Sequence, residues 1–314
     1  MNKQALNIVV SGWEYGAGKS GTSKGPDALL KALQNHIELP NTPKHVDQTV
    51  EAQDVAHIYF PHLKRARHLL KHQSRLANTI EKLNPQTRTL LLTGDHSNAI
   101  GGIAGFCRNR NPENIGIIWI DAHLDLHSPY TTPSGNIHGM SVNTAIEMDN
   151  LDCKVNDLDA DCISLWEEIK NLKKCNAINP ENIVFMGIRS YEDAEIHLIK
   201  TAGIKVLFAE DIHTNGLDWA LNEIQMHFKH KAQEWYVSFD VDSMDPSVSI
   251  GTGTPEAGGL GKEQAAETLQ FFWNQSQTQL LEITEINPEL DTQNPMAEAV
   301  CDLLRPLLGS TNRE

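Results

Sequence analysis

The stretch from Ile115 to Gly139, IGIIWIDAHLDLHSPYTTPSGNIHG, constrains the fold of this chain more than any other segment. Its first six residues are apolar on both faces, which is typical of a strand covered on both sides in a parallel sheet. Polar side chains then follow at alternate positions: Asp121, His123 and Asp125. Because alternate side chains of an extended chain share a face, we expect these three to point together off the carboxyl end of a buried strand, where ligands bind in open α/β sheets.

A second acidic segment favours a cation-binding site over a solvated polar loop. Carboxylate and imidazole groups on one edge suit a divalent cation, although a solvated polar loop would contain the same residue types. In SFDVDSMDP, at 238–246, Asp240 and Asp242 follow an apolar strand and share a face. Two carboxylates that point together into a buried cleft repel each other, and a bound cation removes this repulsion.

A third strand end adds a histidine. The run Thr89–Thr93 predicts a strand, and GDHS follows it with His96. Ligands of oxygen and nitrogen type thus sit at the ends of three strands, and they are too many for one ion that must also bind water. They predict two ions that activate a shared water for hydrolysis. The six ligands are His96, Asp121, His123, Asp125, Asp240 and Asp242.

Strands and helices alternate along the chain, which predicts an α/β fold with a parallel sheet and helices on both faces. We expect one domain, 1–314, with an insertion at about 149–175. The glycine-rich GAGKS near the start lacks the leading glycine of a phosphate loop, so nucleotide binding is rejected.

The alternation gives the following expected elements. The strands are 6–10, 89–93, 115–120, 183–188, 205–209, 234–239 and 280–286. The helices are 26–37, 62–83, 97–106, 140–148, 161–174, 195–200, 218–227, 262–273 and 295–308.

Composition excludes several classes of protein. The 314 residues are 40% hydrophobic and 21% charged, which is a globular composition. The formal net charge of −15 argues against binding to nucleic acid phosphates. No apolar run is long enough to span a membrane, and no signal peptide is evident, so we expect a cytoplasmic protein. Five cysteines without CxxC spacing predict reduced thiols and no disulfide framework.

Four motifs together resemble the arginase/agmatinase (ureohydrolase) family: GDHS at 94–97, DAHLD at 121–125, SFDVDSMDP at 238–246 and EINP at 285–288. The resemblance covers nearly the whole chain. It implies a three-layer α/β/α fold with a mostly parallel sheet, and a binuclear centre of two Mn²⁺ per subunit. The same donor atoms also accept Co²⁺ or Ni²⁺. Family members hydrolyse guanidino groups to urea and an amine, and they are commonly trimers or hexamers.

The resemblance also assigns roles to matching positions. His96 and His123 would be terminal ligands on different ions, and the four aspartates would complete and bridge the pair. A hydroxide bridging the ions would attack the guanidinium carbon. Asp125 would pass a proton to the leaving amine, and Glu285 would hold the guanidinium through charge-assisted hydrogen bonds.

Substrate contacts are implied around SGNIHG, at 134–139. Ser134 and Asn136 would hydrogen-bond the α-carboxylate of the substrate, and His138 would shuttle protons at the mouth of the site. A plain polar turn is the alternative for the first two residues. Thr254 is a further expected substrate contact, and agmatinases usually differ from this chain at SGNIHG.

Two positions depart from the arginase pattern. His127 stands where arginases commonly have asparagine, and Glu192 stands where they commonly have an aspartate for the α-amino group. The leading hypothesis is hydrolysis of L-arginine to L-ornithine and urea. The alternatives are hydrolysis of another guanidino acid or of agmatine, and a non-catalytic relative that binds metal. The intact ligand set with Glu285 and His138 argues against the last alternative.

Overall fold

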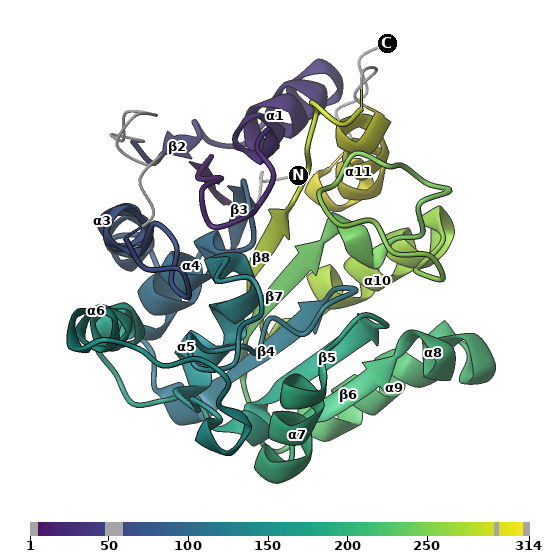
Figure 1. Cartoon of the computed structure of the whole chain (residues 1–314). Coiled ribbons are helices and arrows are strands. Elements are labelled where there is room, and N and C mark those ends of the chain that lie inside the picture. Colours follow the sequence, from purple (N-terminus) through teal and green to yellow (C-terminus); the bar gives the residue numbers. More distant parts are fainter. Residues whose placement is uncertain (1–5, 48–58, 292–294, 310–314) are drawn as a thin grey trace.

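The structure is a computed structural model that describes residues 6–47, 59–291 and 295–309. Within these ranges, eight parallel strands form one sheet in the order β2-β1-β3-β8-β7-β4-β5-β6 (Figure 1). The predicted α/β class with a parallel sheet is confirmed. The strands are β1 (Asn7–Ser11), β2 (Lys44–His45), β3 (Thr89–Thr93), β4 (Ile115–Ile120), β5 (Ile183–Ile188), β6 (Lys205–Phe208), β7 (Glu234–Asp240) and β8 (Thr278–Thr284).

Helices cover both faces of the sheet and give three layers. Figure 1 shows α3, α4 and α5 on one side, and α1, α10 and α11 on the other. The helices are α1 (Gly25–His36), α3 (Ala66–Glu81), α4 (Asn98–Cys107), α5 (Ser141–Ile146), α6 (Ala160–Lys170), α7 (Asp193–Ala202), α8 (Ala209–Asn215), α9 (Leu217–Phe228), α10 (Lys262–Asn274) and α11 (Pro295–Leu308).

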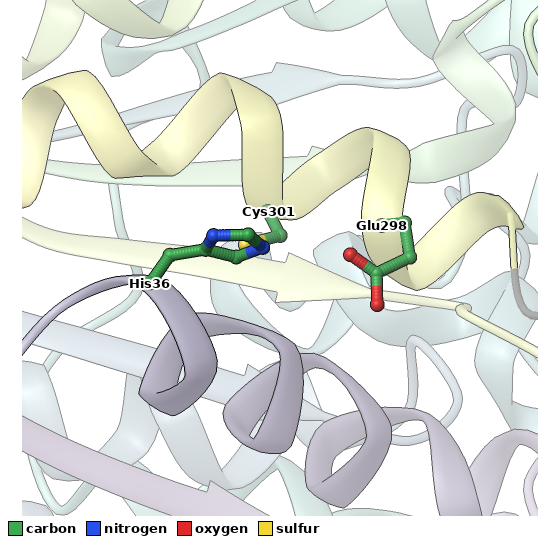
Figure 2. A group of neighbouring side chains, drawn as sticks. All are labelled: His36, Glu298 and Cys301. Atoms are coloured by element: carbon green, nitrogen blue, oxygen red, sulfur yellow. The ribbon is translucent and has the colours of Figure 1, made fainter.

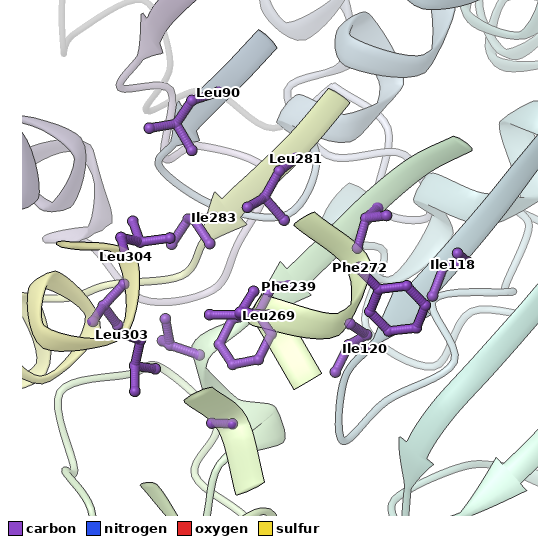
Figure 3. Close-up of a cluster of buried hydrophobic side chains, with 14 of the residues drawn as sticks. Leu90, Ile118, Ile120, Phe239, Leu269, Phe272, Leu281, Ile283, Leu303 and Leu304 are labelled. Atoms are coloured by element: carbon purple, nitrogen blue, oxygen red, sulfur yellow. The ribbon is translucent and has the colours of Figure 1, made fainter. Parts of the chain in front are cut away.

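The alternation of side chains along each central strand divides the core into two layers. Ile118 and Ile120 of β4 pack with Phe239, Leu269 and residues of the C-terminal helix (Figure 3). Ile117 and Trp119, at the intervening positions, pack on the opposite face with α4 and α5. Every residue of β3, β4 and β5 is buried, as expected for strands covered on both sides. The continuous apolar runs therefore arise because neither face of these strands meets water.

The predicted insertion folds as a helix with loops around it. Its helix, α6, runs over Ala160–Lys170 and lies beside α3, where Trp166 and Leu165 join a small separate apolar cluster. The Asp159 side chain accepts a hydrogen bond from the Cys162 backbone N–H and caps the helix. The division into one domain with an insertion stays a prediction, and the chain ends fall outside the described residues.

Two predicted elements differ clearly in their bounds, and two observed elements are missing from the prediction. The strand expected at 280–286 is Thr278–Thr284, because Glu285 has a φ of 66° and ends the extended run. The helix expected at 62–83 begins only at Ala66, after Arg65 with a φ of 59°. Helix α8 and the two-residue strand β2 are missing from the prediction, since both are short and carry no apolar run.

The buried His72 on α3 is expected to make the fold sensitive to acid. Its Nε2 lies 2.9 Å from Ser11 Oγ, its ring stacks on Trp13, and burial and the Arg75 charge lower its pKa from 6.5 to about 4. The unfolded chain therefore takes up a proton near pH 6.5, whereas the folded chain resists protonation until about pH 4. The contribution of His72 to the free energy of unfolding is therefore fully present above pH 6.5. It falls by about 3 kcal/mol as the pH drops to about 4.

Urea unfolding of the metal-free protein at about pH 7 and about pH 4.5 measures this effect. The His72→Gln variant should lose less stability than the native chain between these two conditions. His68→Gln, a change on the same helix at a half-buried position, is the matched control. Equal losses in the native chain and in His72→Gln would contradict the assignment.

Each helix that the structure describes is too short or too polar to cross a membrane.

Candidate metal centre

Four neighbouring strands, β3, β8, β7 and β4, direct polar residues to one edge of the sheet. His96 follows β3 at the start of the turn into α4, and Asp121 directly follows β4. Asp240 is the last residue of β7, and Glu285 directly follows β8. Because all these strands are parallel, their carboxyl ends meet at one place, as the sequence predicts.

The first donor group surrounds His96. Its Nδ1 lies 3.0 Å from Asp121 Oδ2, 3.1 Å from Asp240 Oδ2 and 3.3 Å from Asp125 Oδ2. The four side chains are buried or almost so. One imidazole nitrogen thus faces three carboxylate oxygens at spacings that leave room for a cation among them.

The second donor group surrounds His123. Its Nδ1 lies 3.1 Å from Asp242 Oδ2 and 3.4 Å from Asp121 Oδ1. Asp121 therefore gives one carboxylate oxygen to each group. A carboxylate shared in this way suits two neighbouring ions better than one.

Asp125 reaches the first group by a route that the sequence does not predict. Asp121 Oδ1 accepts a hydrogen bond of 2.7 Å from the His123 backbone N–H, so the chain turns directly after β4. At Asp125 the backbone φ is 50°, in the left-handed region. The expected extended path from 121 to 125 is wrong, although the three side chains converge. A non-glycine residue held there costs conformational energy, as is often found at functional sites.

Support around His96 fixes its tautomer. Ser238 Oγ lies 2.8 Å from His96 Nε2 and donates its proton to Glu282 Oε2 at 3.0 Å. The serine oxygen must therefore accept from Nε2–H, which leaves the Nδ1 lone pair facing the carboxylates. The ring also stacks on Trp119, with 3.9 Å between centroids. This is the form of histidine that binds a metal ion.

The contacts and the pKa values of these histidine and aspartate side chains test whether a pair of metal ions fits. His96 Nδ1 and Asp121 Oδ2 are buried without a hydrogen-bond partner, which is costly unless an ion binds them. Burial and the charges of neighbouring carboxylates raise the pKa of both Asp240 and Asp242. Burial opposes protonation of His123, but Asp242 and Asp121 outweigh it and raise its pKa. The cluster thus needs added positive charge, and two divalent cations would supply it.

Glu285 and His138 stand beside this centre. Glu285 is 5% exposed, has a φ of 66°, and its Oε1 accepts a 2.8 Å hydrogen bond from the His96 backbone N–H. The same oxygen lies 3.5 Å from His138 Nδ1. Burial disfavours the charged His138 ring, but the hydrogen bond and charge of Glu285 raise its pKa to about 9. The two residues form an ion pair at the wall of the site.

A model of the arginase family matches residues 6–309 of the sequence. The chain belongs to the arginase family. It is similar to the arginase of Bacillus subtilis strain 168, with 27% identity over 98% of each chain. It is 30% identical to human arginase-1 over 91% of this chain and 86% of that protein. The solved arginase of Bacillus caldovelox superposes with a TM-score of 0.83 at 25% identity, covering 98% of this chain and 99% of that one.

The five residues expected to contact substrate all lie around one cavity of about 250 Å³ that opens over the centre. Thr254 is also close to the expected metal ligands, since its Oγ1 donates to Asp242 Oδ2 at 3.2 Å. Gly135, with a φ of 75°, lets the loop pass close to Pro61, where any Cβ would collide with the backbone oxygen. The five residues are His127, Ser134, Asn136, Glu192 and Thr254.

The two departures from the common arginase pattern contact each other. His127 Nε2 lies 3.2 Å from Glu192 Oε2 and 3.8 Å from Glu195 Oε2. Glu192 precedes α7, and its pKa is lowered to about 2, first by the hydrogen bond with His127. Glu195 is buried and accepts from the Leu126 backbone N–H at 3.1 Å. The Glu192 side chain therefore reaches across the cavity wall to the His127 ring and forms an ion pair with it when the ring is protonated.

Several supporting residues are missing from the sequence prediction. Asp95 accepts hydrogen bonds from the backbone N–H groups of Gly16 and Ala17, so the glycine-rich GAGKS loop holds a carboxylate of the protein itself. Lys64 donates to Asn136 Oδ1 at 3.4 Å. Asp95 could have been suspected from the sequence, because it stands beside the predicted ligand His96 in GDHS. No local sequence pattern indicates that Lys64 contacts the site.

Proposed function

We propose that this chain hydrolyses the guanidino group of L-arginine to give L-ornithine and urea. The observation that carries the proposal is the pair of histidine and carboxylate groups sharing Asp121, with Glu285 in the same cavity. The chain's membership of the arginase family and its similarity to proteins named arginase support the same activity.

The proposed cofactor is a pair of Mn²⁺ ions, although the same oxygen and nitrogen donors also accept Co²⁺ or Ni²⁺. His96, Asp121, Asp125 and Asp240 would hold one ion, and Asp121, His123 and Asp242 the other. A pair of divalent ions of this kind lowers the pKa of water and neutralises developing negative charge.

Glu285 is proposed to bind the guanidinium. Its carboxylate is buried next to the centre and is held in place by the His96 backbone N–H. A planar guanidinium can donate two parallel hydrogen bonds to such a carboxylate, which would direct its carbon toward the two donor groups. The left-handed backbone at 285 turns the carboxylate into the cavity in place of continuing β8.

Proton transfer is proposed for Asp125 and His138. Asp125 is buried, and burial together with the Asp121 charge raises the pKa of its carboxyl well above the usual value. We propose that Asp125, as a carboxylate that faces both the ions and the substrate, carries a proton to the leaving amine. His138 lies on the other side of Glu285, with about a quarter of its side chain exposed, and can exchange protons with water.

The far end of the cavity is proposed to bind the substrate carboxylate. Ser134 Oγ accepts from the Asn136 backbone N–H at 3.1 Å, so its own hydroxyl proton remains available to a ligand. Lys64 Nζ donates a hydrogen bond to Asn136 Oδ1, so the Nδ2 protons of Asn136 remain available to a carboxylate. The Lys64 ammonium also adds positive charge at this end.

A double substitution, Ser134→Ala with Asn136→Ala, tests this assignment. Because hydrogen bonds to a charged group contribute about 1.5–3 kcal/mol each, kcat/KM for L-arginine should fall about 10²–10⁴-fold. Agmatine has no carboxylate, so its hydrolysis should change little. Urea release from both substrates, measured with matched metal content, gives the comparison. Equal losses on the two substrates would show that these residues do not bind the carboxylate.

A second candidate function is hydrolysis of a guanidino acid that lacks the α-amino group, such as guanidinobutyrate. The contact of His127 with Glu192 favours it, because the carboxylate available for an α-ammonium is already engaged. A panel of guanidino substrates assayed for urea after Mn²⁺ loading separates the two candidates. Higher kcat/KM for guanidinobutyrate than for L-arginine would favour the second.

We propose the cytoplasm as the setting and, from the family resemblance, a homo-oligomer that is a trimer or a hexamer. All five cysteines are free thiols in the structure, which suits a reducing compartment. The net charge of −15 favours a small cationic substrate over nucleic acid.

A further inference from the structure

A second cluster of metal-binding side chains lies between the first and last helices, away from the carboxyl edge of the sheet. His36 is the last residue of α1, and Glu298 and Cys301 lie one turn apart on α11. The two helices pack against each other. Figure 2 shows the His36 ring lying over the Cys301 side chain, with the Glu298 carboxylate beside them.

The geometry brings three different donors together. One ligand atom from each side chain lies within 4.8 Å of the other two. Residues three apart on a helix share a face, so Glu298 and Cys301 approach His36 from the same side. Cys301 is fully buried and forms the floor, whereas His36 and Glu298 are exposed and form the rim.

The rim side chains are free to bind a ligand. No hydrogen bond or ion pair among the described residues involves the His36 ring or the Glu298 carboxylate. The neighbouring Asp302, by contrast, is engaged by Lys262 Nζ at 2.7 Å. Three donors therefore remain, and a bound water would complete a tetrahedron.

We propose that His36, Glu298 and Cys301 bind one Zn²⁺ or a similar first-row divalent ion. Sulfur, nitrogen and oxygen donors match Zn²⁺, whose bonds to them are about 2.0–2.3 Å long, so small side-chain rotations would close the cluster around it. Binding forms a metal–sulfur bond as the thiol proton leaves to water. Burial and the charges of Glu298 and Asp302 raise the pKa of Cys301 to about 11, so the unbound thiol holds its proton.

This site differs chemically from the centre at the sheet edge. The six proposed ligands there offer only oxygen and nitrogen, whereas a thiolate selects softer ions such as Zn²⁺ over Mn²⁺. An ion held by His36 and Cys301 would tie α1 to α11. It would thus join the two ends of the fold and stabilise it without taking part in the reaction.

Co²⁺ is a suitable spectroscopic probe, because thiolate-to-cobalt charge transfer absorbs in the near ultraviolet. Among the proposed ligands of both sites, Cys301 alone has sulfur, so cobalt at the sheet edge gives no such band. The Mn²⁺-loaded protein is titrated with Co²⁺, and the thermal midpoint is measured with and without the ion. The variants are Cys301→Ser, His36→Gln and Glu298→Gln, with Cys162→Ser, another buried helical cysteine, as the matched control.

We expect a band that saturates at about one Co²⁺ per chain, together with a raised thermal midpoint. The band should be lost in Cys301→Ser and retained in Cys162→Ser. His36→Gln and Glu298→Gln should each weaken Co²⁺ binding by at least the roughly 10–100-fold that loss of an outer-shell partner costs. Mn²⁺-dependent urea release should persist in all four variants, which checks folding.

The absence of a band, or its survival in Cys301→Ser, would overturn the proposal. Full affinity in either His36→Gln or Glu298→Gln would also overturn it, since the thiol would then bind without the other two donors.

Discussion

Replacing Asp125 with asparagine is expected to abolish urea release from L-arginine. The residue stands 3.3 Å from His96 Nδ1 and is buried, and we assign it both a metal contact and transfer of a proton to the leaving amine. Asparagine keeps the shape but cannot hold a proton for transfer and carries no charge. Loss of positioned acid–base catalysis costs about 10²–10⁴-fold, and a weakened metal site adds to this. We therefore expect kcat to fall by at least about 10³-fold.

The assay must separate chemistry from metal loss. Metal content is measured on the same samples, and excess Mn²⁺ is added to restore occupancy. Asp157→Asn is the matched control, because that carboxylate is exposed and pairs only with Lys154 in the described structure. Full activity in Asp125→Asn at normal metal content would reject the proton-transfer role.

Replacing Glu285 with glutamine is expected to cause the second largest loss among the single substitutions at the site, this time with the metal centre intact. The amide keeps the length of the side chain and can still accept the His96 backbone hydrogen bond. It cannot pair as an anion with the guanidinium, and loss of one partner of a buried charge pair costs about 2–5 kcal/mol. We expect kcat/KM to fall about 10²–10³-fold while two Mn²⁺ per chain are retained.

Glu289→Gln is the control for this change, because Glu289 is four residues away and pairs with Lys24 at 2.5 Å on the surface. Steady-state kinetics and metal analysis on both variants give the result. If Glu285→Gln lost metal in proportion to activity, Glu285 would be supporting the centre through His96 and the assignment to the guanidinium would fail.

The sequence predicts the fold class and the convergence of the donors, because both depend on local patterns. Continuous apolar runs mark the buried strands, and the polar residues of the site follow these runs within a few positions. The path of the chain beyond the strand ends is harder to predict. The left-handed backbone at Asp125 and Glu285 depends on the surrounding structure, because non-glycine residues rarely adopt it and even aspartate does so in a small minority of cases.

Contacts between distant segments could not be predicted either. Ser238 and Glu282 orient His96 from two other strands, and Lys64 reaches Asn136 from a loop 72 positions earlier. In the sequence alone, nothing distinguishes a serine in a strand or a lysine before a helix from other residues of the same type. Helix α8 is missed for a simpler reason, since its sequence AEDIHTN has too few apolar residues to show a period.

The position of β8 in the sheet has a consequence for synthesis of the chain. This last described strand inserts between β3, which is made much earlier, and β7, the strand made just before it. A chain still on the ribosome, before β8 emerges, presents two open strand edges and lacks Glu285. Products of premature termination before this point would therefore be inactive and prone to associate through those edges.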